Sequence, residues 1–331
     1  MAPSRPNALP RIALTLGDPA GISPEIVRAA LLDERVVAAL EPVVLGPSEL
    51  RIPGCEVVES AEELQLAERK SGRSLWLDSS RGELGSFEMG RAQKNCGRAA
   101  LDALRLGADL GLGGQVDGLV TAPVCKEAMH MAGEKVEGQT ELLRRWASAE
   151  RCQMMAIAGD MRVLMATRHM PTAAAIASLT PKLILDSLDL LYESMVGFGF
   201  DKPHLAVAGV NPHASERGLF GDDEQRVLMP AIEEARTKGF HVTGPEPPDT
   251  VFVAAMAGKY DAVLALYHDQ GFIPVKLAAP TTCVTVLLGM PYLRVSPAHG
   301  TAFDIAGKGV ASPENLITAL LQAAAWIPGR A

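Results

Sequence analysis

The sequence is poor in the features that mark several large classes of protein. Its five cysteines are odd in number and scattered, and no two of them form a CxxC pair, so neither a disulfide framework nor a zinc ribbon is predicted. No apolar run reaches the roughly 18–20 residues needed to cross a bilayer. The first ten residues are polar and proline-containing, without the apolar core of a signal peptide. We therefore expect a protein of the reducing cytoplasm that has no membrane partner.

Positive charge is also scarce. The chain has 31 Lys and Arg against 39 Asp and Glu, which gives a formal net charge of −8. A protein that binds the phosphate backbone of a nucleic acid draws its affinity from a basic face, so we expect no nucleic-acid partner. A small anionic substrate remains compatible with this charge, because it needs only a few local cations.

Strand-length apolar runs alternate with helical stretches along the 331 residues. The predicted strands are Ile12–Leu16, Val43–Leu45, Gly118–Thr121, Val163–Thr167, Leu205–Val210, Ala262–Tyr267 and Val284–Leu288. The predicted helices are Pro24–Leu32, Asn95–Leu112, Glu141–Ala149, Pro181–Gly197, Glu224–Lys238 and Pro313–Ala325. This alternation predicts an α/β fold with a mostly parallel sheet covered on both faces. The length favours two domains, or one large α/β unit, and the proline-rich stretch Gly244–Pro248 is interpreted as a surface loop.

Three of the seven histidines follow the carboxyl end of a predicted strand. They are His169, His213 and His268. Because strand ends on one sheet edge converge, these imidazoles are candidates for a divalent metal site with an open position. Asp269 and Asn211 could orient them or contact a substrate. The alternative is three unrelated capping or core histidines. Three of the others are interpreted as structural: His130, His204 and His241.

A glycine-rich loop, HGTAFDIAGKG at residues 299–309, is the most specific stretch of the chain. Its glycines allow close backbone approach, and Asp304 is suited to accept hydrogen bonds from ribose hydroxyls, which favours NAD over NADP. No GxGxxG follows the first predicted strand. The loop is similar to the nucleotide-binding loop of the β-decarboxylating dehydrogenases of the isopropylmalate and isocitrate type, although a glycine-rich surface loop without function would share the pattern.

The whole chain, from about Ile12 to Ala325, resembles the 4-hydroxythreonine-4-phosphate dehydrogenase family. The resemblance rests on ordered landmarks. They are Leu16-Gly17-Asp18-Pro19-Ala20-Gly21-Ile22 with Pro24-Glu25, Thr121-Ala122-Pro123 with Lys126, Gly138-Gln139-Thr140-Glu141, Asn211-Pro212-His213-Ala214, His268-Asp269-Gln270-Gly271 and His299-Gly300-Thr301-Ala302.

The resemblance implies an isopropylmalate dehydrogenase-like fold of two domains with an interdomain cleft, working as a homodimer. We expect an NAD-loop-bearing domain from residues 1–130 with 290–331. Residues 131–289 would form the metal, substrate and dimerisation domain. The implied reaction is the oxidation of a secondary alcohol by NAD(P), followed by decarboxylation, as in pyridoxine biosynthesis. One divalent metal (Zn, Mg, Co or Mn) would assist this reaction.

The resemblance also assigns roles to residues of this sequence. The metal ligands would be His169, His213 and His268. The substrate-binding positions would be Gln139, Thr140, Lys276, Thr285 and Arg294. The cofactor would contact His299, Gly300, Thr301, Ala302 and Asp304. Candidates for the proton acceptor are Asp249, Asp269 and Lys126.

The sequence departs from the family pattern at two substrate positions. Gln139 stands where the family usually has His, and Thr285 stands where it usually has Asn. The segment Ala278–Cys283 also lacks the Gly-Phe common after the matching lysine. The substrate could therefore be 4-phosphohydroxy-L-threonine or, alternatively, a 4-phosphorylated threonate or erythronate, or a cis-dihydrodiol dicarboxylate such as terephthalate dihydrodiol. A non-catalytic metabolite-binding protein is the alternative from another class.

Overall fold

The chain folds into two compact units in a computed structural model that describes residues 9–327. The polar start of the sequence lies almost wholly outside these residues. The first unit combines the chain up to residue 150 with the chain from 290 onward, and the second spans 151–289. Residues 131–150 thus join the first unit and not the second, because Leu142 and Leu143 are buried in the same apolar cluster as Leu101 and Leu104.

The sheet of the first unit is entirely parallel. Its strand order is β3-β4-β2-β1-β5-β12. The strands are β1 (Arg11–Thr15), β2 (Glu41–Gly46), β3 (Glu56–Val58), β4 (Leu75–Asp78), β5 (Gly118–Thr121) and β12 (Leu293–Pro297). The central strands β1, β2 and β5 are buried along their whole length, as expected for a parallel sheet with both faces covered.

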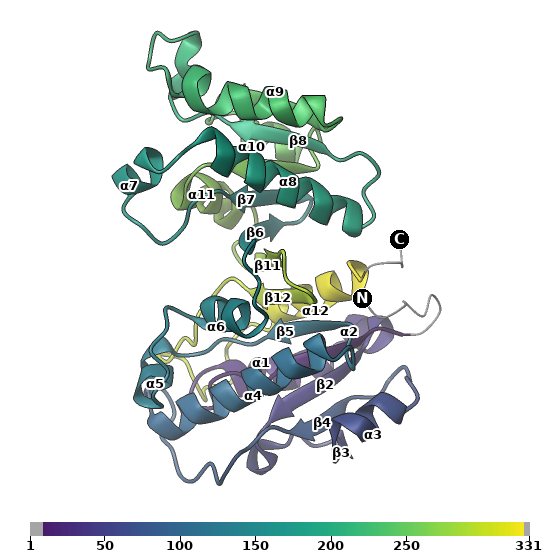
Figure 1. Cartoon of the computed structure of the whole chain (residues 1–331). Helices are drawn as coiled ribbons and strands as arrows, with labels where there is room; N and C mark the ends of the chain where they lie inside the picture. Colours follow the sequence, from purple (N-terminus) through teal and green to yellow (C-terminus); the bar gives the residue numbers. More distant parts are fainter. Residues whose placement is uncertain (1–8, 328–331) are drawn as a thin grey trace. The chain divides into compact units, whose positions relative to one another are not determined.

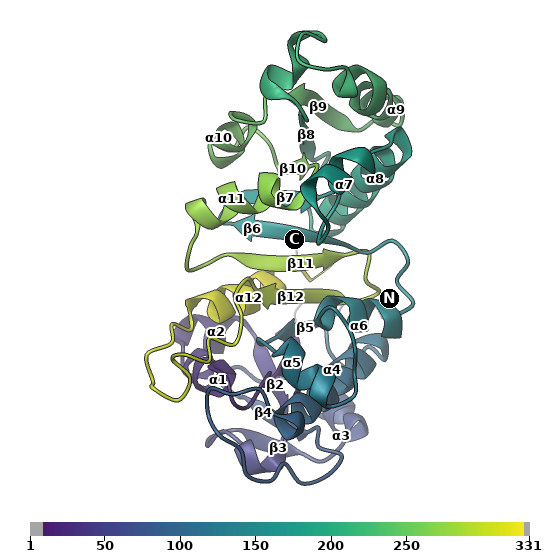
Figure 2. The ribbon, with the colours of Figure 1, turned by 90° about the vertical axis from the view of Figure 1, so that its left-hand side faces the viewer.

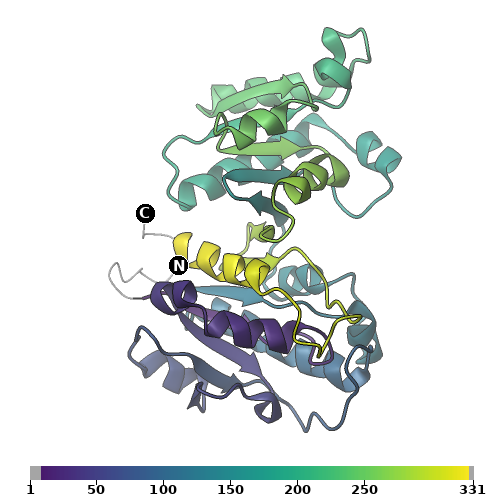
Figure 3. The ribbon, with the colours of Figure 1, turned by 180° about the vertical axis from the view of Figure 1, so that it is seen from behind.

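Helices cover both faces of this sheet. Helix α4 packs on β1, β2 and β5 and lies in front of the sheet in Figure 1, whereas α1 and α12 lie on the opposite face, which Figure 3 brings to the front. Figure 2 shows α5 and α6 beside α4. The helices of this unit are α1 (Ser23–Leu31), α2 (Glu34–Ala39), the short η1 (Ser48–Leu50), α3 (Ala61–Leu66), α4 (Lys94–Leu112), α5 (Lys126–Met131), α6 (Gln139–Trp146) and α12 (Glu314–Ala325).

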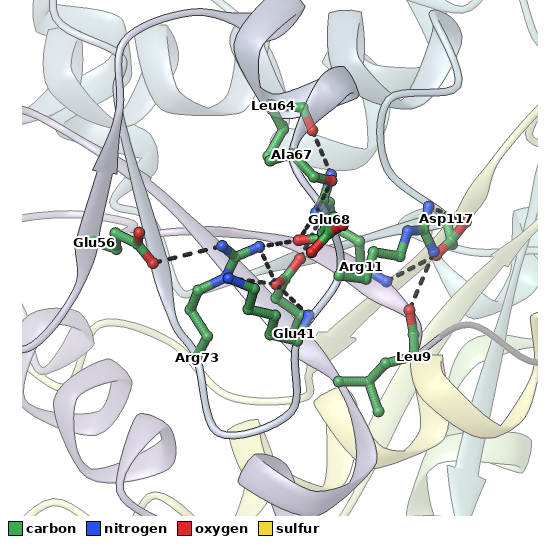
Figure 4. Close-up of polar contacts among 11 residues, drawn as sticks. Leu9, Arg11, Glu41, Glu56, Leu64, Ala67, Glu68, Arg73 and Asp117 are labelled. Atoms are coloured by element: carbon green, nitrogen blue, oxygen red, sulfur yellow. Dashed lines mark hydrogen bonds and ion pairs between the residues drawn. The ribbon is translucent and has the colours of Figure 1, made fainter.

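A buried ionic network ties the start of β1 to the start of β2 and to the chain before β4 (Figure 4). The Arg11 Nε donates to Glu41 Oε2 at 2.6 Å, and the Arg73 Nη2 donates to Glu41 Oε1 at 2.7 Å. The Arg11 guanidinium also donates to the backbone oxygens of Leu64 and Ala67. Because the buried charges are paired and their remaining donors are satisfied, the network avoids the cost of an isolated buried charge.

The sheet of the second unit is mixed. Its order is β11-β6-β7-β10-β8-β9, in which β7, β10, β8 and β9 are parallel and β6 is antiparallel to both neighbours. The strands are β6 (Gln153–Ala158), β7 (Met161–Met165), β8 (His204–Ala208), β9 (His241–Glu246), β10 (Ala262–Ala265) and β11 (Val284–Leu288).

Helices again cover both faces of this second sheet. Helices α8 and α9 pack on one face, and α10 and α11 pack on the other, which is toward the viewer in Figure 3. The helical segments are α7 (Thr172–Ala177), α8 (Pro181–Gly197), η2 (Pro212–Glu216), η3 (Glu224–Leu228), α9 (Met229–Thr237), α10 (Val251–Met256) and α11 (His268–Ala278).

The structure confirms the predicted α/β class, with mostly parallel strands and helices on both faces. The interpretation of Gly244–Pro248 as a loop is wrong over its first part, because β9 continues through Pro245 to Glu246. Among residues 9–327, strand β9 pairs only with β8, and an edge strand tolerates proline, since its missing N–H faces no partner. All five cysteines are free thiols, and within residues 9–327 no helix has the length and apolarity to cross a membrane.

Candidate functional site

Three neighbouring strands of the second unit end in segments that carry the candidate metal ligands. Strands β7, β10 and β8 lie side by side in that order. His169 follows β7, His268 begins α11 just after β10, and His213 lies in η2 after β8. All three strands are parallel, so their carboxyl ends meet at one edge of the sheet, which is where ligands bind in open α/β sheets.

His169 and His268 form a pair at this edge. Their ring centroids lie 5.9 Å apart with a tilt of 42°, and both residues line a cavity of about 160 Å³ together with Thr167 and Asp269. The Nδ1 of His268 lies 2.7 Å from the Asp269 carboxylate, which fixes the ring and leaves Nε2 for a ligand. A carboxylate behind a histidine is the arrangement that orients metal-binding imidazoles.

His213 occupies an unusual turn and is not brought to the same point as the other two histidines. Residues 213–217 all have positive φ, with His213 at φ 54 and ψ 29. Each non-glycine residue in this conformation costs roughly 1–2 kcal/mol, so surrounding contacts must hold the turn. Among the described residues, the three histidines do not form a group whose ligand atoms lie within 4.8 Å of one another. The donor chemistry, imidazole nitrogen supported by a carboxylate, nevertheless fits a borderline cation such as Zn²⁺ better than Mg²⁺.

Two candidate proton acceptors and one candidate cation lie on α11, which begins with His268, or in the groove beside it. Asp249 and Asp269 line a mostly apolar groove of about 570 Å³ between α10 and α11. Both carboxylates belong to exposed residues. Lys276 is exposed on α11 with its Nζ 5.5 Å from the centre of the Phe272 ring, so it is available to an anion. Thr285, by contrast, is buried on β11.

The remaining candidate substrate residues belong to the first unit. Arg294 is buried on β12, and its Nη2 donates to the hydroxyl of Thr121 at the end of β5 over 2.6 Å. Gln139 and Thr140 begin α6, where the Gln139 Nε2 approaches the Ala122 oxygen at 3.5 Å. The Oε1 of Gln139 is buried without a hydrogen-bond partner among the described residues. Lys126, the first residue of α5, is exposed.

The glycine-rich loop 299–309 packs on the segment that follows β1. The Ile22 N–H donates to the Thr301 oxygen at 3.0 Å, and the Gly309 N–H donates to a Glu25 carboxylate oxygen at 2.9 Å. The Asp304 side chain is exposed, while its backbone oxygen accepts from Lys308 Nζ at 2.7 Å. The loop is thus held by backbone contacts, and its one central carboxylate is open to a ligand.

Sequence reasoning gave no role to Asp18, which lies directly after β1. Its Oδ1 accepts from the Ala20 N–H at 2.9 Å, whereas its Oδ2 is buried without a hydrogen-bond partner among the described residues. Burial raises the pKa of Asp18 to about 6, and the N–H groups of Ala20 and Cys125 oppose the shift. The signal in the sequence was a carboxylate between Gly17 and Pro19 at a strand end.

The described residues thus hold one parallel and one mixed sheet, a histidine pair at a strand edge and a glycine-rich loop with one open carboxylate. The fold and these features fit an α/β dehydrogenase, which is the class that the names of the relatives give. The family described as "Pyridoxal phosphate biosynthetic protein PdxA" matches residues 32–323. The chain belongs to this family, whose curated members include the 4-hydroxythreonine-4-phosphate dehydrogenases.

Individual relatives match the chain over nearly its whole length. A 4-hydroxythreonine-4-phosphate dehydrogenase of Desulforapulum autotrophicum is 37% identical over 95% of both chains. A D-threonate 4-phosphate dehydrogenase of Salmonella typhimurium is also 37% identical, over 93% of this chain and 96% of its own. A crystal structure of 4-hydroxythreonine-4-phosphate dehydrogenase from Klebsiella pneumoniae superposes with a TM-score of 0.84 at 35% identity, covering 95% of this chain and 98% of that one.

Similarity to the aromatic branch is weaker. A terephthalate 1,2-cis-dihydrodiol dehydrogenase from Burkholderia xenovorans gives a TM-score of 0.67 at 27% identity, covering 94% of this chain and 98% of that one. Both values fall below those of the phosphorylated-substrate enzymes. The dihydrodiol alternative therefore becomes the less favoured one.

Proposed function

We propose that the chain is a metal-dependent NAD(P) dehydrogenase that oxidises a secondary alcohol of a 4-phosphorylated hydroxy acid, with loss of CO₂ from the resulting keto acid. The observation that carries this proposal is the pair of His169 and His268, 5.9 Å apart at adjacent strand ends with Asp269 behind His268. Family relatives named for 4-phosphorylated acids support the substrate class.

We assign the metal to His169, His268 and His213. A divalent cation bound there would act as a Lewis acid toward the alcohol oxygen and the ketone formed from it. We assign the nucleotide to the loop 299–309, with His299, Gly300, Thr301, Ala302 and Asp304 as its contacts. The open Asp304 carboxylate would accept hydrogen bonds from the ribose hydroxyls and disfavour a 2′-phosphate, which supports NAD over NADP.

The chain's own cations and hydrogen-bond donors would hold the anionic substrate. Arg294 presents a planar guanidinium from a buried strand, so its fork is fixed before the anion binds. Lys276 adds a second, mobile charge. Thr140 and Thr285 would contribute hydroxyls, and the buried Oε1 of Gln139 would accept from a substrate donor, an interaction that would satisfy this otherwise unpartnered atom.

The proton of the alcohol needs an acceptor, and three residues are candidates. Asp269 is the first choice because it already contacts His268. Asp249 lines the same groove as Asp269. Lys126 is the third candidate, on the first unit.

A second substrate is favoured by a specific observation. The relative named for D-threonate 4-phosphate is 37% identical to this chain, the same value as the Desulforapulum autotrophicum hydroxythreonine enzyme, over more than nine tenths of both chains. Gln139 and Thr285 also depart from the usual family residues. A 4-phosphorylated threonate is therefore the alternative substrate, and a cytoplasmic location suits either of them.

One experiment tests the reaction and the substrate together. NADH formation would be followed with purified, metal-loaded protein on 4-phosphohydroxy-L-threonine, 4-phospho-D-threonate and terephthalate dihydrodiol in parallel. We expect turnover of a phosphorylated acid and its loss, together with the bound metal, in His213→Ala. Turnover of the dihydrodiol alone, or full activity in metal-free protein, would contradict the proposal.

The quaternary structure is also part of the proposal. We propose a homodimer in which a second copy of the chain covers the groove between α10 and α11. Val253, Met256, Ile273 and Leu277 are large apolar residues on these two helices, and all four are exposed. A contiguous apolar patch of this kind marks an interaction surface, and the family resemblance supports a second copy as its occupant.

A further inference from the structure

Three buried polar side chains lie at the histidine-bearing edge of the second unit, and none of them is a candidate metal ligand. Thr167 is 5% exposed, Gln270 is 9% exposed and Glu224 is 2% exposed. Burying polar groups costs free energy unless they are hydrogen-bonded. Their partners therefore show what these side chains do.

Thr167 and Gln270 join the ends of the three strands. The Thr167 hydroxyl, after β7, donates to the Leu266 oxygen after β10 at 2.7 Å. The Gln270 Oε1 accepts from the Leu266 N–H at 2.7 Å, and its Nε2 donates to the Gly209 oxygen after β8 at 2.8 Å. The Thr167 side chain thus connects the end of β7 to the end of β10, and the Gln270 side chain connects the end of β10 to the end of β8. Both contacts lie beyond the last residues of these strands.

Glu224 holds the segment between β8 and the left-handed turn. Its Oε1 accepts from the N–H groups of Val210 and Asn211 at 2.9 and 2.7 Å, and its Oε2 accepts from the Asn211 Nδ2 at 3.0 Å. A buried carboxylate that accepts from three N–H donors binds them strongly. These contacts fix the residues just before the turn 213–217. They thereby help to hold its five positive φ values, which are unfavourable on their own.

Near each histidine, one contact falls at the same distance along the chain. Thr167 stands two residues before His169, Leu266 stands two residues before His268, and Asn211 stands two residues before His213. Each histidine therefore leaves the sheet from a backbone position that a buried side chain has fixed. The further contacts at Gly209 and Val210 hold the same segment closer to the end of β8.

We propose that Thr167, Gln270 and Glu224 are positioning residues that fix the spacing of the three histidine-bearing strand ends for one divalent cation. This inference rests on the proposed metal function. Metal affinity then depends on residues that do not touch the metal, and loss of such supporting contacts typically weakens binding by about 10–100-fold.

The test uses near-isosteric changes and a metal with a visible spectrum. Co²⁺ would be titrated into wild type, Thr167→Val and Glu224→Gln, with the affinity and the d–d absorption bands recorded. We expect affinity to fall about tenfold in T167V and about 100-fold in E224Q, with shifted bands, because the imidazoles are no longer held in one arrangement. NAD affinity should not change, since the nucleotide loop belongs to the first unit.

Two further variants make the result unambiguous. Glu233→Gln removes an exposed carboxylate from α9 and should bind Co²⁺ as wild type does. His213→Ala reports on the metal site itself: if it keeps wild-type Co²⁺ affinity, the proposed metal function fails. If H213A loses Co²⁺ while both T167V and E224Q keep the wild-type affinity and bands, with or without a lower Tm, the positioning role is overturned. Should E224Q fail to fold, T167V decides the question.

Discussion

Asp18 shows how one buried side chain connects stability to pH. Its carboxyl group lies at the end of β1, fully buried, with one oxygen unpartnered among the described residues. Burial raises its pKa from 3.8 to about 6. Between these two values the folded protein keeps the proton that the unfolded chain releases. Stability is therefore highest below pH 4 for this group and is lost as the pH rises through 6.

Replacing Asp18 with Asn removes this dependence, because the amide cannot ionise. From pH 4 to pH 8, the free energy of unfolding of D18N should rise relative to wild type by up to about 3 kcal/mol, the equivalent of two pKa units. Urea unfolding at the two pH values measures the difference. Asp201→Asn, a change at an exposed carboxylate, should show no such trend, and a pH-independent offset in D18N would contradict the assignment.

Asp304 is the residue on which the proposed NAD site depends most. Its side chain is exposed at the centre of a loop that is held by backbone contacts, so Asp304→Ala should leave the loop folded. We expect NAD affinity to fall about tenfold, as for the loss of one charged hydrogen-bonding group, with little change in substrate affinity. Calorimetric titration with NAD measures this, and Asp201→Ala serves as the control. Unchanged NAD affinity would remove the role of Asp304.

The residues that sequence reasoning could identify differ in kind from those it missed. The candidate histidines lie just after strand ends and Asp304 lies in a glycine-rich loop. Both patterns involve neighbouring residues, so they can be recognised from the sequence alone. Glu224 and Gln270 act through backbone groups of Asn211 and Gly209, which are 13 and 61 positions away. Only the tertiary fold brings such partners together, so no local pattern could reveal them.

At the scale of helices and strands, the elements that were predicted are those with a continuous or periodic pattern of apolar residues. The buried strands β1, β5, β10 and β11 are short apolar runs in the sequence, and their bounds were predicted to within two residues. Strand β12 was missed because it carries Arg294 and ends in Pro297. Helix α11 was missed because it contains Gly271 and Pro274. A Cβ at Gly271 would lie 3.0 Å from Met165 Sδ, so this glycine lets the helix lie close on β7.

The contact between α4 and α5 gives a prediction at this scale. Gly97 lies inside α4, where a Cβ would be 2.0 Å from the Ala128 backbone oxygen. Gly→Ala in a helix normally stabilises by about 1 kcal/mol, but here the backbone of α5 would have to move. We expect Gly97→Ala to destabilise the protein by about 2 kcal/mol or more, as overpacking does.

A matched variant separates packing from helix propensity. Gly197 ends α8 and has no atom within 4 Å of the position where its Cβ would lie. Gly197→Ala should therefore be neutral or slightly stabilising in the same urea-unfolding measurement. If both alanines had the same effect, the close approach of α5 to Gly97 would not be the cause.

For the whole molecule, the proposed homodimer rests on the groove between α10 and α11. Leu277 on α11 is 78% exposed. Leu277→Glu would introduce a charge that dimer formation must desolvate, so we expect sedimentation to show a monomer in place of a dimer. Leu66→Glu is the matched control, because Leu66 on α3 is 85% exposed in the first unit. A dimer that survives L277E, or a monomeric wild type, would contradict the proposed assembly.

The second unit has one further property, which follows from how the chain enters and leaves it. It is a single uninterrupted stretch, residues 151–289, whose first and last strands pair antiparallel, with Gln153 opposite Leu288. Its two ends therefore emerge side by side. The histidine-bearing unit is therefore joined to the rest of the chain at one pair of neighbouring junctions, near residues 150 and 290. Recombination at these two junctions would transfer all three histidines, and with them the proposed metal site, as one block.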